Sequence, residues 1–132
     1  MADIETSTTC EEGYKSVSRV GDFRLTVDAT SEDGPEPNSV LVANYASCYL
    51  PALRVGGQQN GEDDLGKMTI EAEADLDDDD DLTGIHFNLK LEADIDEETA
   101  EAIVADGKDI CHVHSAVREG LQADVDVETD AF

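Results

Sequence analysis

Two of the three cysteines, one on a predicted apolar helix and one at a predicted helix start, form the most chemically suggestive pair in the chain. Cys48 lies in the segment Asn-Tyr-Ala-Ser-Cys-Tyr-Leu-Pro-Ala-Leu, residues 44–53, and Cys111 opens the segment Cys-His-Val-His-Ser-Ala-Val, residues 111–117. A redox site with two thiols needs one thiol that ionises to a reactive thiolate and a second within bridging reach, with Cα atoms about 4.4 to 6.8 Å apart. Cys48 and Cys111 are therefore the candidate pair, provided that the fold brings them together.

The two cysteines are predicted to experience different local fields. Cys48 lies about ten residues into a predicted helix, beyond the reach of the helix dipole, and burial alone would raise the pKa of its thiol. A reactive Cys48 would therefore need a nearby cation, for which Arg19 and Arg24 on a predicted hairpin are the candidates. Cys111 follows Asp109, which is expected to cap a short helical turn whose free amides stabilise a thiolate. Local fields alone thus predict Cys111 to be the more acidic thiol.

Two metal sites are conceivable, and the spacing favours neither. Cys111, His112 and His114 carry ligand types that suit zinc, but the only other histidine is His86, in a predicted strand, so a fourth ligand is missing. His112 or His114 could also serve as a base for Cys111. The five aspartates of 77–81 lack the calcium-loop pattern, because the twelfth position is an Asn instead of a Glu. We expect a solvated turn there and no metal in the protein.

The charge of the chain is extreme: 33 acidic residues against 8 basic ones give a net charge of −25. Hydrophobic residues still make up 39% of the chain and follow regular periods, which indicates a folded protein and not an acidic disordered one. Molar salt shortens the screening length to about 3 Å and would remove most of the self-repulsion. We therefore predict a protein from a halophile, and we expect neither nucleic acid nor anionic membranes as partners.

The cysteine count and the hydropathy of the chain indicate the cellular compartment of the protein. The third cysteine, Cys10, lies in a polar N-terminal segment, and an odd cysteine count argues against a structural disulfide framework. No apolar run approaches the ~20 residues that cross a bilayer. We expect a cytoplasmic protein.

The hydrophobic periodicity predicts an α+β domain. Alternation predicts five strands, the first two forming a hairpin around Gly21 and Asp22, and they span residues 14–20, 23–29, 68–76, 85–95 and 121–127. Two helices are predicted, over 38–55 and from the capping residue Asp96 to a stop at Gly107. The order is β-β-α-β-β-α-β with mainly antiparallel strands. Residues 1–13 are predicted as a polar tail, 14–128 as a single domain and 129–132 as a C-terminal tail.

The first predicted helix is apolar on almost every side and must be covered all round. One small domain can hardly enclose it, so we expect a second copy of the chain to complete the burial in an obligate homodimer. Pro51 lies inside this helix and is expected to kink it beside Cys48.

The two cysteine segments together resemble the OsmC/Ohr family of peroxide-reducing proteins. The resemblance rests on residues 34–53 and 111–117 and extends over nearly the whole element order. It implies an intertwined homodimer around a buried central helix, in which Cys48 attacks an organic hydroperoxide and becomes a sulfenic acid. By the same resemblance Cys111 forms a disulfide with Cys48, an external dithiol reduces it, with a lipoyl-type dithiol as one candidate, and no cofactor takes part. Arg19, with Arg24 as alternative, is implied to support the Cys48 thiolate.

The chain departs from the family pattern at two places. Asn38 and Ser39 follow Pro37, where the family commonly has a Glu that pairs with the arginine, and His112 replaces the usual Pro. The alternative interpretation is therefore a redox sensor or stress-binding protein on the same fold that does not turn over.

Overall fold

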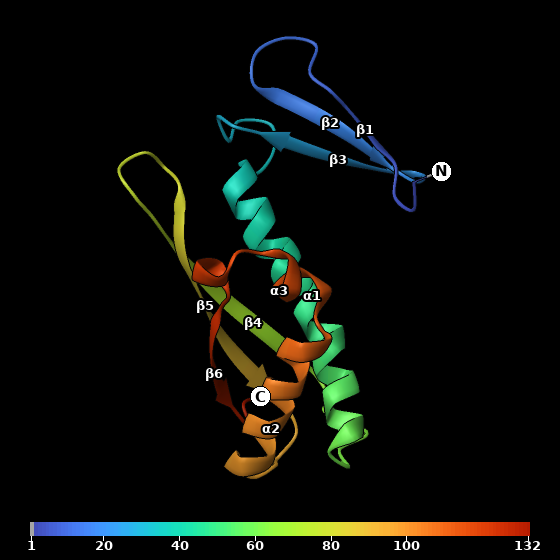
Figure 1. Cartoon of the computed structure of the whole chain (residues 1–132), viewed down its shortest axis with the longest axis vertical. Helices are drawn as coiled ribbons and strands as arrows, with labels where there is room; N and C mark the ends of the chain where they lie inside the picture. The colour runs from blue at the N-terminus through green and yellow to red at the C-terminus, as the bar shows by residue number, and fades with distance from the viewer. Residues whose placement is uncertain (1) are drawn as a thin grey trace. The chain divides into compact units, whose positions relative to one another are not determined.

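A computed structural model describes residues 2–132 of the chain. The chain divides into two compact units, one ending at Leu41 and the other beginning at Val42. The first unit is an antiparallel sheet of β1 (Thr6–Thr9), β2 (Lys15–Val20) and β3 (Phe23–Asp28), drawn in blue in Figure 1. Gly21 adopts a positive φ of 61°, which suits the tight turn between β2 and β3. The predicted hairpin is confirmed.

Strand β1 was not predicted, because its segment was read as part of a polar tail. Its four residues Thr-Ser-Thr-Thr are all exposed and show no alternation of polar and apolar types. The strand forms through backbone pairing with β2, in the register Thr6 to Val20 and Thr9 to Val17. The predicted tail over 1–13 therefore contributes a strand to the sheet.

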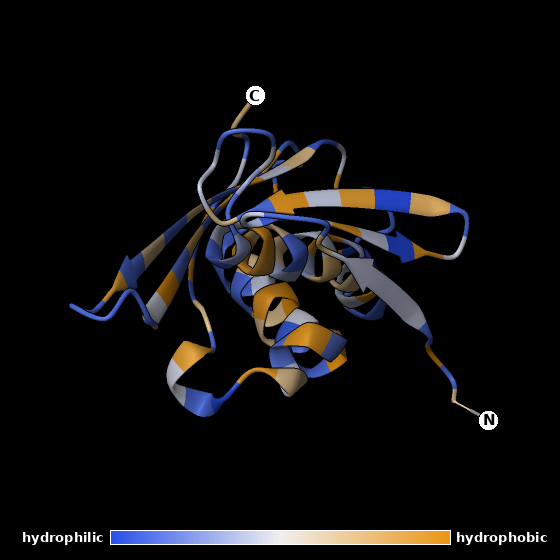
Figure 2. Cartoon of the chain, turned by 90° about the horizontal axis from the view of Figure 1, so that it is seen from above, coloured by the Kyte–Doolittle hydropathy of each residue, from blue (hydrophilic) through white to orange (hydrophobic). Residues whose placement is uncertain are grey.

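The sheet of the first unit has one apolar face, as the alternation predicts. Cross-strand pairing places Val20 opposite Phe23 and Ser18 opposite Leu25, and Figure 2 shows the alternation of hydrophobic and hydrophilic residues along the strands. We expected this face to be half-buried, yet Phe23 is 76% and Leu25 52% exposed. A single chain leaves the face largely open.

Helix α1 (Pro37–Gln59) is the long helix predicted from the apolar run. Its buried positions Tyr45, Tyr49 and Leu53 recur every four residues and pack within the second unit. Leu41, one step earlier in the same row, and Val55 remain 38% and 41% exposed. Pro51 lies within the helix, which is assigned without a break; the kink stays a prediction.

The second unit contains a mixed sheet of three strands. β4 (Met68–Leu76) pairs antiparallel with β5 (Leu82–Leu91), and β6 (Asp124–Glu128) pairs with β5 in parallel. The helical elements are α2 (Glu97–Ile110), α3 (His112–Ala116) and the 3₁₀ turn η1 (Glu119–Leu121). The α+β class and the predicted element order are confirmed, with β1 and α3 added.

Helix α2 begins as predicted and ends later than predicted. The Thr99 amide donates to the Asp96 carboxylate at 2.7 Å, so Asp96 is the N-cap. Gly107 does not stop the helix, which continues to Ile110. A Cβ atom at Gly107 would lie 2.9 Å from Leu53 Cδ2, so this glycine serves the close approach of α1 and α2. Asp109 lies inside α2 and caps nothing, because Cys111 itself caps α3.

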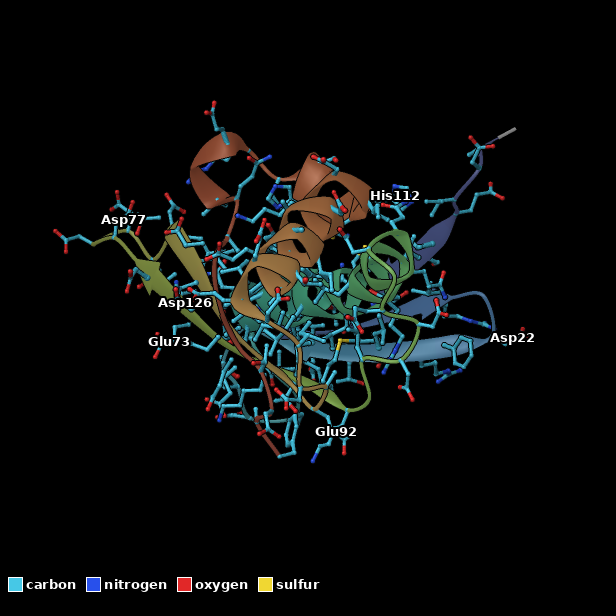
Figure 3. The ribbon with its side chains drawn as sticks, turned by 90° about the horizontal axis from the view of Figure 1, so that it is seen from below. Asp22, Glu73, Asp77, Glu92, His112 and Asp126 are labelled. Atoms are coloured by element: carbon cyan, nitrogen blue, oxygen red, sulfur yellow. The ribbon has the colours of Figure 1, made fainter. Side chains whose placement is uncertain are left out.

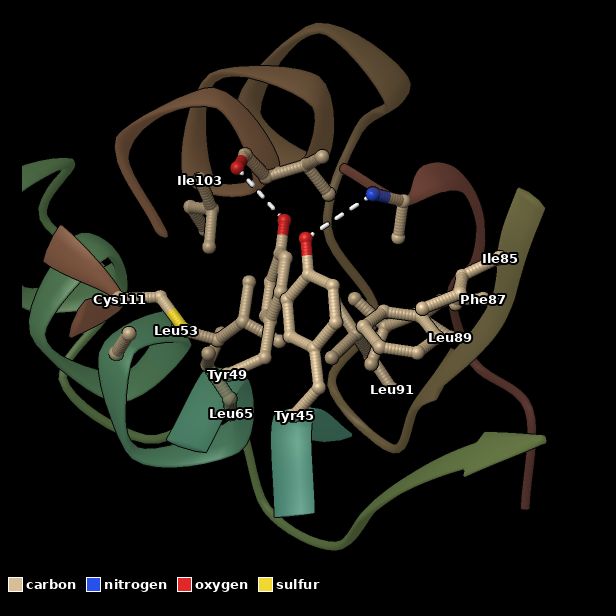
Figure 4. Packing of buried hydrophobic residues seen from close by; sticks show 13 residues of the cluster. Tyr45, Tyr49, Leu53, Leu65, Ile85, Phe87, Leu89, Leu91, Ile103 and Cys111 are labelled. Carbon is tan, nitrogen blue, oxygen red and sulfur yellow. Dashed lines mark hydrogen bonds between the residues drawn. The ribbon is translucent and has the colours of Figure 1, made fainter. Parts of the chain in front are cut away.

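The core of the second unit forms around two tyrosines of α1 (Figure 4). The rings of Tyr45 and Tyr49 meet Phe87 edge to face, with centroids 4.8 and 5.8 Å away. The Tyr49 hydroxyl donates to the Val104 carbonyl at 2.8 Å, and the Ala123 amide donates to the Tyr45 hydroxyl at 3.0 Å. Aromatic burial and satisfied hydroxyls together hold α1 on the sheet and on α2.

Acidic side chains cover the outer surface. Glu73, Asp77, Glu92 and Asp126 are four of these exposed acidic residues and are labelled in Figure 3. The Asp77 carboxylate accepts the amides of Asp79 and Asp81, at 2.8 and 3.0 Å, and so closes the aspartate run into a turn. Among residues 2–132, no helix has the length and apolar character to cross a membrane.

Candidate active site

The fold brings the two predicted redox cysteines together, although 62 residues separate them in the sequence. Cys48 lies on α1, and Cys111 lies at the junction of α2 and α3. Both are free thiols, and the Cys111 side chain lies close enough to act on the Cys48 thiol as a hydrogen-bond partner. The structure thus supplies two neighbouring thiols, while their catalytic roles stay a prediction.

Cys48 has a lowered thiol pKa. The largest cause is the backbone amide of Val113, and further contributions come from the Cys111 thiol and the amide of His112, against the opposing effect of burial. Both amides belong to the first turn of α3, where backbone N–H groups have no partner within the helix. Helix α1 cannot stabilise the Cys48 thiolate by its own dipole. The stabilising amides therefore come from α3.

Cys111 has a raised thiol pKa. Its side chain is only 1% exposed, and burial is the largest cause; the neighbouring Cys48 raises the pKa further, while the His114 amide lowers it. That amide donates to the Cys111 sulfur at 3.4 Å, which makes Cys111 the cap of α3.

The prediction that Cys111 is the more acidic thiol is therefore wrong. Burial outweighs the His114 and Val113 amides at Cys111, whereas at half-buried Cys48 the Val113 amide outweighs burial. The expectation that Cys48 could become acidic only through an arginine is wrong for the same reason.

Arg19 and Arg24 form a cross-strand pair in the first unit. They lie directly opposite each other on β2 and β3, on the face that carries Lys15, and they line an open hollow there with Lys15, Glu11 and Glu12. In the part of the chain that the structure describes, neither guanidinium forms an ion pair or a hydrogen bond. Like charges directly opposite each other destabilise a sheet unless an anion joins them. Both thiols belong to the second unit, so the role of either arginine stays a prediction.

Glu36 has a local role that the sequence analysis did not assign to it. Its carboxylate accepts the amides of Asn38 and Ser39, at 3.0 and 2.5 Å, and the Ser39 hydroxyl at 2.6 Å. The Ser39 hydroxyl is the largest cause of the lowered pKa of Glu36. The acidic residue nearest to the missing family Glu thus serves the start of α1.

Tyr45 and His114 form a contact beside the thiols that sequence reasoning missed. The Tyr45 hydroxyl is hydrogen-bonded to His114 Nδ1, and Gln122 Nε2 donates to the His114 carbonyl at 3.1 Å. Tyr45 precedes Cys48 by three residues and His114 follows Cys111 by three, which places both near the pair. A tyrosine with a polar end in an otherwise apolar helix was the available signal.

The histidines do not gather into a metal cluster. His86 lies on β5 with its Nε2 atom 3.0 Å from the Asp126 carboxylate and 3.3 Å from Asn88. Over residues 2–132, no group of three or more His, Cys, Asp or Glu side chains is arranged to hold a metal ion.

Comparison with known proteins adds a family to this geometry. The family model described as OsmC-like protein matches residues 19–126. An uncharacterized protein of Haloferax volcanii is 57% identical over 132 residues, covering the whole of both chains, and its source supports the predicted halophilic origin. The organic hydroperoxide resistance protein-like 1 of Staphylococcus epidermidis is 26% identical over 132 residues, which is 94% of each chain. The crystal structure of an OsmC like protein from Mycoplasma pneumoniae superposes with a TM-score of 0.81 at 15% identity, over 97% of this chain and 96% of that one.

Proposed function

Because the chain belongs to the OsmC-like protein family, we propose that it is a thiol-dependent peroxidase that reduces organic hydroperoxides. The observation that carries the proposal is the unequal pair: a half-buried Cys48 with a lowered pKa beside a buried Cys111 with a raised one. The thiolate is the nucleophile in such chemistry, so the cysteine that ionises first is the one suited to attack. The name of the Staphylococcus relative, organic hydroperoxide resistance protein-like 1, agrees with this substrate class.

In the proposed reaction the Cys48 thiolate attacks the terminal oxygen of the hydroperoxide. The O–O bond breaks, the alkoxide takes up a proton and leaves as an alcohol, and Cys48 becomes a sulfenic acid. The Cys111 sulfur then attacks the Cys48 sulfur, and the S–O bond breaks. The Cys111 proton and the departing hydroxide form water, and a Cys48–Cys111 disulfide remains. An external dithiol, for which the lipoyl type is a candidate, reduces this disulfide and is itself oxidised.

The burial of Cys111 suits the second role. A side chain that is 1% exposed is shielded from peroxide in solution, while its neighbour Cys48 is accessible to a small substrate. The proposal also includes Arg19, with Arg24 as alternative, as the cation that supports the Cys48 thiolate. Both guanidiniums lack an anionic partner within residues 2–132, so each is free to take one.

The proposed protein acts as a homodimer in a salt-rich cytoplasm. Large apolar side chains remain open in the single chain, among them Phe23 at 76%, Leu25 at 52% and Val55 at 41% exposure. A second copy would cover them. It would also complete the burial of α1, which a single chain buries only in part.

The test is hydroperoxide consumption in molar salt with an excess of dithiol. We expect Cys48→Ser to abolish consumption. Without dithiol, we expect Cys111→Ser to consume one equivalent and to keep Cys48 as the sulfenic acid, whereas the parent forms the disulfide. Cys10→Ser is the matched control, because Cys10 is exposed and its thiol is hydrogen-bonded to the carbonyls of Glu12 and Gly13. Consumption by Cys48→Ser at the parent rate would refute the proposal.

A redox sensor on the same fold is the second candidate function. The observation that favours it is the absence of a Glu after Pro37, where Asn38 and Ser39 stand instead. A sensor would form the disulfide with one equivalent of peroxide and then stall, even with excess dithiol. Continued turnover would exclude it.

A further inference from the structure

The Tyr45 hydroxyl joins three elements of the second unit at one buried point. Tyr45 is 0% exposed, on α1. Its oxygen accepts the Ala123 amide, just before β6, at 3.0 Å, and its other partner is Nδ1 of His114 on α3. The two side chains also pack as tilted rings with centroids 5.9 Å apart. Helix α3 is therefore tied to α1 through one side-chain hydrogen bond.

The geometry assigns the proton in this bond. Tyr45 has a single hydroxyl proton. Of its two hydrogen-bond partners among residues 2–132, the Ala123 amide is a donor and only His114 Nδ1 can accept, so we assign the proton to the bond with His114 Nδ1. A ring nitrogen that accepts a hydrogen bond carries no proton, so the imidazole is neutral, with its proton on Nε2. No buried side-chain oxygen or nitrogen lacks a partner in the described part of the chain, which agrees with this assignment.

Helix α3 is short and has few contacts that hold its position. It contains five residues, none of them fully buried, and Val113 packs partly buried against the core. Besides the bond to Tyr45, its polar contacts outside the helix among residues 2–132 are the Gln122 amide, which donates to the His114 carbonyl at 3.1 Å from an exposed side chain, and the Val113 and His112 amides at the Cys48 sulfur. Yet α3 carries both features of the thiol site: Cys111 at its cap, and the Val113 and His112 amides at the Cys48 sulfur.

We propose that His114 is a positioning residue for disulfide formation, because its neutral imidazole accepts the Tyr45 proton and so holds the Cys111 turn against Cys48. This inference rests on the proposed pairing of the two thiols. His114 acts through Tyr45 and the turn, since its hydrogen bond to the Cys111 sulfur is made by its backbone amide. Loss of the bond lets the turn move away, and the Cys111 sulfur then reaches the Cys48 sulfur less often.

The positioning bond depends on the charge of His114. A protonated imidazole donates from both nitrogens, so the Tyr45 proton loses its acceptor. The charged and titratable groups around the ring are Tyr45 on α1, Lys108 and Asp109 on α2, and Cys111 at the α3 cap. Burial is the largest cause that lowers the His114 pKa below its usual 6.5, and Lys108 adds to it, against Asp109. The bond is thus present at neutral pH and is lost as the pH falls through this lowered value.

The experiment measures the attack of Cys111 without any peroxide. In a Cys10→Ser background and molar salt, dipyridyl disulfide reacts with the Cys48 thiolate, forms a mixed disulfide and releases one coloured thiopyridone. Cys111 then attacks the Cys48 sulfur, gives its proton to solvent and releases the second thiopyridone. The rate of the second release reports the positioning of Cys111, and Cys48→Ser controls for direct reaction of Cys111 with the reagent.

Three substitutions separate the hydrogen bond from mere bulk. We expect His114→Ala to slow the second release roughly tenfold, the effect of losing one buried hydrogen bond. His114→Asn keeps an acceptor at the δ position that does not titrate, so we expect the parent rate at neutral pH. In acid every variant slows as the Cys111 thiolate is protonated, and we expect His114→Asn to lack the additional slowing that protonation of His114 gives the parent. His86→Ala is the matched control, because this histidine lies on β5 with Asp126 and Asn88 as its partners, and it should match the parent.

A second variant tests the partner. Tyr45→Phe keeps the ring and removes the hydroxyl, and we expect it to slow the second release as His114→Ala does. Residues that act through one bond are not additive, so the double variant should be no slower than the slower single variant.

The inference is overturned by a folded His114→Ala protein that resolves at the parent rate. It is equally overturned if His114→Asn is as slow as His114→Ala, if His114→Asn slows in acid as steeply as the parent, or if the parent shows no second release. If His114→Ala does not fold, the pH profile of the second release in His114→Asn decides whether the inference holds. Failure of peroxide consumption with this two-step behaviour intact would refute the peroxidase proposal and leave the positioning role standing.

Discussion

The two units of the chain differ in how completely a single copy encloses its apolar residues. Among residues 2–132, no buried hydrophobic side chain lies before Tyr45, whereas the second unit buries Tyr45, Tyr49, Phe87 and a shell of aliphatic residues. The first unit leaves Phe23 76% exposed on a sheet face with regular alternation. The second unit also completes the thiol pair and its amides, while the arginines of the first unit have no anion. Alternation thus indicates that a face is to be buried, but not by which copy of the chain.

The largest expected effect is on the free energy of unfolding, and it comes from replacing a phenylalanine by alanine. Each unit offers one phenylalanine for the comparison. Phe87→Ala removes a fully buried ring that two tyrosines contact, and we expect a loss of about 3–5 kcal/mol in the free energy of unfolding. Denaturant titration in molar salt at one protein concentration measures it. Phe23→Ala should keep the circular dichroism spectrum and weaken self-association, followed by sedimentation at several concentrations. Equal self-association in the Phe23→Ala variant and the parent would contradict the proposed cover for this face.

Several parts of this comparison could be predicted from the sequence. Alternation and apolar runs gave the hairpin, α1 and β4, because these patterns arise from burial of one face. β1 had no such pattern, since Thr6–Thr9 pairs through its backbone alone. The late end of α2 was missed because Gly107 is needed for contact between helices, which local propensity does not reveal.

The acidity of Cys48 was missed for a similar reason. Its amide donors, Val113 and His112, lie more than 60 positions away in the sequence, and only the tertiary structure brings them to the sulfur. The pairing of Tyr45 with His114 has the same origin. Sequence could name the reactive residues, but their electrostatic surroundings are set by elements that are distant in the chain.

A smaller effect should follow from filling the contact between α1 and α2 in the second unit. Gly107→Ala would place a Cβ atom 2.9 Å from Leu53 Cδ2 and 3.2 Å from Tyr49 Cε1. We expect overpacking to lower the free energy of unfolding by about 1–3 kcal/mol, in spite of the better helix propensity of Ala. Gly120→Ala is the control, because a Cβ there meets nothing within 4 Å. Equal denaturation midpoints for the two variants would show that the helices can separate at no cost.

The smallest expected effect is on the pH midpoint of Cys48 alkylation. It tests which unit lowers the pKa of Cys48. Alkylation by iodoacetamide follows the thiolate, so its rate against pH gives the midpoint of Cys48 in a Cys10→Ser background, with modification located by mass spectrometry. The amides of α3 hold the pKa of Cys48 below the ordinary 9.0, and burial holds that of Cys111 above it. Cys48 should therefore be alkylated at lower pH than free cysteine, and Cys111 only at higher pH.

Replacing the proposed cation then sharpens the comparison between the units. In Arg19→Gln, and separately in Arg24→Gln, we expect the Cys48 midpoint to rise only part of the way, because the Val113 and His112 amides remain in place. A midpoint that returns fully to that of free cysteine would show that the second unit does not complete its own thiolate field. A midpoint unchanged in both variants would remove the arginines from the proposal and leave the first turn of α3 as the source of the acidity. Either result assigns the activation of Cys48 to one unit of the chain.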